Sequence, residues 1–224
     1  METFARSEAQ SAAAAAAIAA ALEGPGAKSL IVTGGRSPGA VYDRLAATAL
    51  DWSSVTVTLS DDRWVAEDSP DSNAALVRRR LLTGRAAAAK FLPLKGRGSS
   101  PEADALSVEP ALASVLPAGA TLLGMGDDGH IASLFPGDPD LARRLDPDGG
   151  RLCVGVPVAG LEPFVPRVSL TLRALLAARV VIVLISGAAK RAVVERVAGD
   201  PAYAPPVAAL LRQDRVPVRV LWTA

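Results

Sequence analysis

Five apolar segments, rich in β-branched residues, recur along this chain and constrain its fold more than any other feature. They read SLIVTGG, VTVTLSD, ATLLGMG, VVIVLISG and VPVRVLW. A strand that faces solvent on one side alternates apolar and polar residues, whereas continuous apolar runs are typical of strands covered on both faces. The sequence therefore predicts a sheet enclosed between two layers of structure.

Helical patterns separate these segments and predict how the strands are connected. An alanine-rich run, SAAAAAAIAAALEG, predicts an opening helix that ends near Gly24. Further helices are expected at about 39–49, 73–82, 102–115 and 188–198. Alternating strands and helices favour parallel pairing through right-handed crossovers. We expect an α/β fold, a single Rossmann-like domain over residues 1–224, with a mainly parallel sheet flanked by helices.

Composition narrows the class of partner. The chain is 50% hydrophobic, and its 24 basic and 23 acidic residues give a formal net charge of +1. This balance offers no global attraction for nucleic acid or an anionic membrane, so we expect neither partner. Glu2 and Glu8 outnumber Arg6 before the alanine run, unlike the basic start of a secretion signal. We expect a cytoplasmic protein that is a monomer or a weak homodimer. Surface loops are expected at 95–101, 136–150 and 199–206.

The chain has one cysteine and one histidine, which limits its chemistry. Cys153 cannot form an internal disulfide, and its setting in RLCVGVPV predicts a buried strand. Metal sites need several His, Cys or carboxylate ligands at recognisable spacing, so we expect no metal and no cofactor. No G-x-S-x-G elbow occurs, and Ser133 is predicted to start a short helix. Water is therefore the expected nucleophile.

The loop after the first apolar segment, TGGRSPG, has the features of an anion site. Gly34 and Gly35 can adopt positive φ, and Pro38 can open a helix at its first position. Backbone N–H groups and the hydroxyls of Thr33 and Ser37 could then hold a phosphate. A tight turn without a ligand is the alternative.

Two nucleotide motifs nearly match, and both fail. Gly34 and Gly39 have the spacing of a P-loop, but Ala40 and Val41 stand where Lys and Ser or Thr belong. The stretch GMGDDG satisfies G-x-G-x-x-G, yet its two aspartates would face a pyrophosphate. Neither an ATPase nor a dinucleotide enzyme is expected.

Charged residues follow the second apolar segment, in LSDDRWVAEDSPDSN. Arg63 offers a rigid fork for phosphate oxygens, and Asp61 could hold that fork or bond to sugar hydroxyls. A surface salt bridge is the alternative. Asp71, Ser72 or Asn73 is expected to cap the next helix.

His130 follows a buried strand in ATLLGMGDDGHIASLFPG, on a glycine turn predicted to lead into a short helix. Free imidazole has a pKa of about 6.5, so much of it is neutral at pH 7 and can accept a proton. Asp128 could fix the tautomer of the ring, although a structural histidine is the alternative. Lys190 falls in the first turn of a predicted helix and opposes its dipole, which a bound phosphate would offset.

Four stretches carry a family resemblance: TGGRSP, SDDRWV…DSN, GMGDDGHIASLFPG and RVSLTL…VIVLISGAAKR. In this order and spacing the chain resembles the glucosamine-6-phosphate isomerase/6-phosphogluconolactonase family over nearly its whole length. The third stretch favours the lactonases, because related deaminases and isomerases continue from the glycine-His turn towards Asn-Glu-Pro. The resemblance implies a NagB/RpiA-like fold that hydrolyses 6-phospho-D-glucono-1,5-lactone to 6-phospho-D-gluconate in the oxidative pentose phosphate pathway, without metal or cofactor.

The resemblance also implies roles for individual residues. His130 would deprotonate water for attack on the lactone carbonyl and return the proton to the departing ring oxygen, with Asp128 in support. N–H groups of the glycine turn are expected to hold the oxyanion. With the residues argued above, the predicted substrate and phosphate site comprises Thr33, Gly34, Gly35, Arg36, Ser37, Asp61, Arg63, Gly126 and Lys190.

Three positions depart from the family pattern, and two alternative functions are considered beside lactone hydrolysis. Arg36 stands where SGGSTP has a small hydroxyl residue, so it either adds a phosphate contact or points into solvent. Asp62 replaces the glutamate of DERW, which alters how Arg63 is held, and Ala66 replaces a proline. The alternatives are a hexosamine-phosphate isomerase or deaminase, and a sugar-phosphate sensor that binds without turnover.

Overall fold

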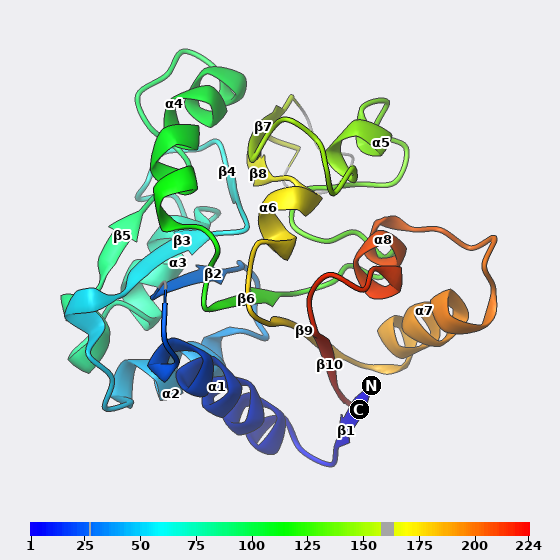
Figure 1. Ribbon diagram of the computed structural model, residues 1–224, viewed down its shortest axis with the longest axis horizontal. Coiled ribbons are helices and arrows are strands. Elements are labelled where there is room, and N and C mark those ends of the chain that lie inside the picture. The colour runs from blue at the N-terminus through cyan, green and yellow to red at the C-terminus, as the bar shows by residue number, and fades with distance from the viewer. Residues whose placement is uncertain (27, 158–163) are drawn as a thin grey trace.

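Seven strands form one parallel sheet in the computed structural model, which describes residues 1–26, 28–157 and 164–224 (Figure 1). The strand order is β1–β10–β9–β6–β2–β3–β5, and every neighbouring pair is parallel. The strands are β1 (Glu2–Phe4), β2 (Ser29–Val32), β3 (Thr56–Leu59), β5 (Lys90–Leu92), β6 (Ala120–Leu123), β9 (Val181–Ser186) and β10 (Val218–Thr223). All five apolar segments contribute strands, so the predicted parallel α/β architecture is confirmed.

Helices cover both faces of this sheet. The α-helices of the described chain are α1 (Ser7–Glu23), α2 (Gly39–Ala47), α3 (Asn73–Arg80), α4 (Pro101–Val115), α5 (Leu141–Arg144), α6 (Leu172–Leu176), α7 (Ala188–Gly199) and α8 (Pro206–Arg212). In Figure 1, α1 and α2 lie on one side of the strands, and α6 and α8 lie on the other. The predicted helices are confirmed as α1, α2, α3, α4 and α7. In the described part of the chain, no helix is long and apolar enough to cross a membrane.

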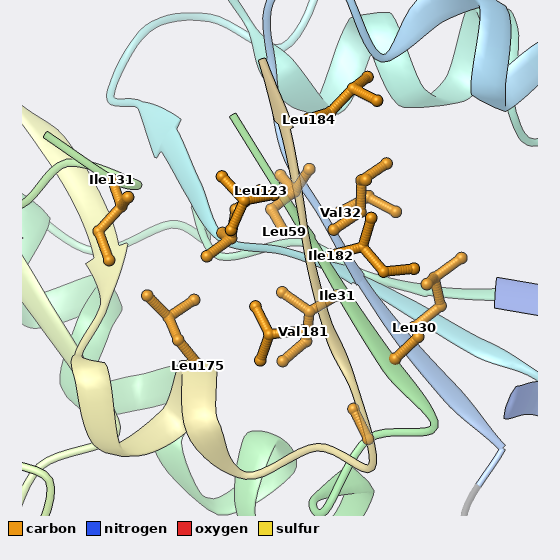
Figure 2. Close-up of a cluster of buried hydrophobic side chains, with 14 of the residues drawn as sticks. Leu30, Ile31, Val32, Leu59, Leu123, Ile131, Leu175, Val181, Ile182 and Leu184 are labelled. Atoms are coloured by element: carbon orange, nitrogen blue, oxygen red, sulfur yellow. The ribbon is translucent and has the colours of Figure 1, made fainter. Parts of the chain in front are cut away.

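The core lies along the central strands. Every residue of β2 and β6 is buried, as expected for strands with covered faces. Figure 2 shows Ile31, Val181 and Ile182 from the sheet in one apolar cluster with Leu175 of α6. Burying one such side chain stabilises a fold by about 1.5–3 kcal/mol, so this cluster holds the strands and α6 together.

A second, antiparallel sheet was not predicted from the sequence. It consists of β4 (Asp61–Arg63), β8 (Arg167–Leu170) and β7 (Cys153–Val156), in that order. Cys153 is buried in β7, as expected. The Glu109 carboxylate of α4 accepts backbone N–H bonds from Leu152 and Cys153 at 2.7 and 3.1 Å, which ties this sheet to α4. In this sheet, the pairing of β4 with β8 sets Arg63 directly opposite Arg167.

Three local predictions are corrected by the structure. Residues 131–134 form a turn, not a helix, because Ala132 has a left-handed backbone with φ +49°. Ser133 therefore starts no helix; its hydroxyl donates instead to Asp61 Oδ2 at 2.7 Å. Pro38 is the N-cap of α2, one residue before its first position. The loop predicted at 136–150 contains the short helix α5.

Candidate active site

The topology gathers distant loops at one edge of the sheet. The chain runs from β2 outward to β3 and β5 and then returns to β6 on the other side of β2. Ligands collect beyond the carboxyl ends of strands at such a switch point. A cleft of about 330 Å³ opens there, and the segments after β2, β6 and β9 contribute residues to its lining. It is lined by Thr33, Gly34, Gly35, Arg36, Ser37, Pro38, Asp61, Arg63, Asn73, Gly124, Met125, Gly126, His130, Ala132, Arg167, Leu184, Ser186 and Lys190.

All predicted site residues except Asp128 therefore lie around this cleft. Asp128 lies in an adjoining groove with Arg196 and Tyr203, and it reaches the cleft through its contact with His130. Sequence reasoning missed Arg167, although this residue heads the RVSLTL stretch of the resemblance. It considered Asn73 only as a helix cap.

The loop after β2 is anchored at its start by Tyr42 of α2. The buried Tyr42 hydroxyl donates to the carbonyl oxygen of Thr33, and the Thr33 N–H donates to the same hydroxyl at 3.1 Å. Burial raises the pKa of Tyr42, so the phenol stays neutral and keeps its donor. Gly35 takes a positive φ of 97°, whereas Gly34 does not. Arg36 is exposed at the mouth of the cleft.

The first turn of α3 holds the Arg63 side chain. Ser72 is the N-cap and accepts the Ala75 N–H, which decides among the three cap candidates. Arg63 Nη1 donates to Asn73 Oδ1 at 2.7 Å and to the Asp71 carbonyl oxygen at 3.0 Å. Two acceptors fix one end of the guanidinium, so the position of this fork is set before any ligand arrives.

The Asp62 side chain binds the backbone at the start of the same helix, α3. Its carboxylate accepts backbone N–H bonds from Arg63 and Asn73 at 2.8 and 2.7 Å, and from Ala74 at 3.1 Å. Burial raises the pKa of Asp62 to about 6, and the neighbouring charge of Asp61 acts in the same direction. The three N–H donors oppose this rise without cancelling it.

The raised pKa makes the contribution of Asp62 to stability pH dependent. Protonation is favoured in the folded state, so the contribution is largest below the ordinary pKa of Asp and is lost as pH rises through about 6. Relative to Asp62→Asn, the parent's free energy of unfolding should therefore fall by about 1 kcal/mol between about pH 5 and pH 7.5. Urea unfolding of both proteins measures this; a difference that does not change with pH contradicts it.

His130 and Asp128 form a hydrogen-bonded pair on the turn after β6. His130 Nδ1 lies 2.6 Å from Asp128 Oδ1, and the imidazole is 22% exposed. A carboxylate only accepts, so Nδ1 carries the proton and Nε2 of the neutral ring keeps a free lone pair. The Gly126 N–H donates to the His130 carbonyl and the Gly129 N–H to the Gly126 carbonyl, both at 3.0 Å. These two glycine N–H groups are used within the turn and are not available to an oxyanion.

Phe135 contacts both the imidazole of His130 and the guanidinium of Arg167. The centroid of the Phe135 ring lies 4.7 Å from the centroid of the His130 ring. Arg167 Cζ lies 5.3 Å from the Phe135 centroid. The cation over the aromatic face is held by cation–π attraction. Burial lowers the pKa of Arg167, but an arginine stays charged in proteins. The phenyl ring is thus packed against both the imidazole and one of the fixed positive charges of the cleft.

The charges around the cleft are mainly positive. Lys190 lies in the first turn of α7, after Gly187, which has φ +83°. Among the described residues, the cationic side chains that line the cleft are Arg36, Arg63, Arg167 and Lys190, and one carboxylate, that of Asp61, lines it with them. Such a cluster attracts a dianion, and arginine forks match the geometry of phosphate oxygens.

Comparison with known proteins identifies the family of this chain. The family model described as glucosamine-6-phosphate isomerases/6-phosphogluconolactonase matches residues 3–222. A 6-phosphogluconolactonase of Caulobacter vibrioides is 47% identical over 190 residues, which cover 85% of this chain and 81% of the relative. The crystal structure of a 6-phosphogluconolactonase from Shewanella baltica superposes with a TM-score of 0.90 at 34% identity, covering 100% and 97% of the two chains.

The same fold also supports a different activity in more distant proteins. A monomeric glucosamine-6-phosphate deaminase superposes with a TM-score of 0.81 at 20% identity, covering 100% of this chain and 97% of that one. This likeness concerns the fold alone. The family model matches nearly all of the sequence, and one relative is 47% identical, which together assign the family. The chain belongs to the glucosamine-6-phosphate isomerase/6-phosphogluconolactonase family.

Proposed function

We propose that this chain is a 6-phosphogluconolactonase that hydrolyses 6-phospho-D-glucono-1,5-lactone to 6-phospho-D-gluconate. The observation that carries the proposal is the cleft at the switch point, where an imidazole paired with a carboxylate shares one cavity with a cluster of cationic side chains. An ester hydrolase for a phosphorylated substrate needs a base at one end of its site and an anion clamp at the other.

The phosphate end would be held by the loop after β2 and the cations near it. Gly34, Gly35 and the hydroxyls of Thr33 and Ser37 present donors, and Arg63 and Lys190 supply charge. Arg167 joins this group because it lies opposite Arg63 in the small sheet. Fixing the distant phosphate also orients the lactone carbonyl, which can lower the barrier by several kcal/mol when the geometry is good.

The chemical step would belong to His130. Nε2 takes a proton from water as the oxygen adds to the lactone carbonyl, which gives a tetrahedral oxyanion. The bond from this carbon to the ring oxygen then breaks, and the imidazolium returns its proton to the leaving oxygen. Asp128 holds Nδ1–H throughout and stabilises the imidazolium.

The remaining expectations belong to the same proposal. The reaction would serve the oxidative pentose phosphate pathway, in the cytoplasm, without metal or cofactor. We expect one domain over residues 1–224, acting as a monomer or weak homodimer on a small phosphorylated lactone.

Acid release from freshly generated 6-phosphogluconolactone tests the proposal. After spontaneous hydrolysis is subtracted, the enzyme should open this lactone much faster than the unphosphorylated gluconolactone. Ammonia release from glucosamine 6-phosphate is the parallel assay for a deaminase. Phosphosugar binding without catalysed hydrolysis would instead identify a sensor, and ammonia release would identify the deaminase.

A further inference from the structure

Asn73 is a buried side chain that links three separate walls of the cleft. Its side chain is only 2% exposed, and both ends of its amide are used. Oδ1 accepts from Arg63 Nη1 at 2.7 Å, and Nδ2 donates to the Asp61 carbonyl oxygen at 2.8 Å. Because donor and acceptor are both engaged, the amide has one orientation.

The third wall is the glycine loop after β2. A Cβ built on Gly34 would lie 1.9 Å from Asn73 Oδ1, and Gly34 does not have a positive φ. Glycine is therefore needed at this position for space, not for backbone conformation. The glycine loop and the Asn73 amide are thus packed directly against each other.

The backbone of Asn73 is fixed as well. Its N–H donates to the buried Asp62 carboxylate at 2.7 Å, at the start of α3. Asn73 thus joins β4, the start of α3 and the glycine loop. A helix cap needs none of these side-chain contacts, and Ser72 already provides the cap.

We propose that Asn73 is a positioning residue for phosphate recognition, which sets the place of the Arg63 guanidinium relative to the glycine loop. The inference rests on the proposed function. Arginine has a long flexible side chain, and holding it in place before binding avoids the loss of freedom that a ligand must otherwise offset. Asn73 acts through Arg63, so its removal weakens the grip on the phosphate. Arg167, Lys190 and the glycine loop still orient the bound substrate, and His130 is not affected, so the hydrolysis step is kept.

The test compares phosphorylated and unphosphorylated lactones. Asn73→Ala should raise KM for 6-phosphogluconolactone about tenfold or more with kcat within about threefold, as removal of a uniform binding interaction does. The kcat/KM for unphosphorylated gluconolactone should stay at the parent value. Equal losses on both substrates would mean a merely structural role and would overturn the proposal.

A double-mutant cycle with Arg63→Ala tests the route of the effect. In that background Asn73→Ala should cause no further rise in KM, because the group it positions is gone. A full additional tenfold rise would refute action through Arg63. Asn73→Ser has a shorter side chain and also takes the acceptor away from Arg63, so it should raise KM in the same way. It serves as the second variant if the alanine protein does not fold.

Calorimetric binding of inorganic phosphate separates this inference from the proposed function. Asn73→Ala should weaken phosphate binding about tenfold whether or not the parent opens the lactone. A parent without lactonase activity refutes the proposed function alone. Unchanged phosphate affinity in the variant refutes the role of Asn73 alone.

Discussion

Replacing His130 by alanine is expected to lower kcat for lactone hydrolysis by about 10²–10⁴-fold. Asp128 occupies Nδ1 of the imidazole at 2.6 Å, which leaves Nε2 on the cleft residue His130 to accept a proton from water. Binding of 6-phosphogluconate should change little, because the cations that grip its phosphate remain in place. Initial rates corrected for spontaneous opening measure kcat, and calorimetry measures the affinity for the product.

Asp128→Asn provides the matched comparison for this variant. The amide keeps the size of the side chain but removes the charge that stabilises the imidazolium and selects the tautomer. We expect a loss of kcat smaller than that of His130→Ala and no loss of product affinity. A parent-like rate in His130→Ala would show that another group activates the water. A parent-like rate in Asp128→Asn alone would leave the base assignment standing and remove the role of the carboxylate.

The parallel sheet could be predicted from the sequence because burial on both faces leaves a local signal. β2 and β9 contain continuous apolar runs, Leu30–Val32 and Val181–Ile185, and each run is followed by a polar residue and a glycine. The small antiparallel sheet left no such signal, since β4 consists of Asp61, Asp62 and Arg63. Its strands are held by pairing with Arg167–Leu170 and by carboxylates of α4, which are contacts between distant parts of the chain.

The candidate site was predictable to the extent that its residues follow strands. His130, Arg63 and Lys190 were located by their place after an apolar run, and parallel strands bring such places to one edge. The structure adds Asn73 and Arg167 to the cleft. The local pattern of Asn73 indicates a helix cap, and that of Arg167 indicates a strand, so the place of both in the cleft follows from tertiary contacts.

Glycine roles divide in the same way between local and tertiary causes. Gly35 and Gly129 have positive φ, which a turn pattern predicts. Gly34 and Gly126 do not, and at both a Cβ would collide with a side chain of the site. From the sequence, Gly34 was expected to adopt a positive φ, and the glycine turn at Gly126 was expected to supply N–H donors for the oxyanion. The structure shows that both positions need a residue without a side chain.

Gly126→Ala is expected to lower kcat by about 10²-fold or more, although alanine adds only one methyl group. The new Cβ would lie 2.1 Å from His130 Nδ1 and 2.6 Å from Asp128 Oδ1, so the pair must separate or the turn must shift. Overpacking of this kind typically costs about 1–3 kcal/mol, and the free energy of unfolding should fall accordingly. Stopped assays of lactone opening and urea unfolding measure the two effects.

Gly199→Ala is the matched control, because the same substitution at the end of α7 meets no atom within 4 Å. It should keep the parent kcat. The loss in Gly126→Ala should also disappear in a His130→Ala background, since both changes remove the same imidazole from its working position. A further fall in that background would mean that Gly126 acts on the substrate directly. If Gly126→Ala kept the parent kcat, the placement of the imidazole above this glycine would be wrong.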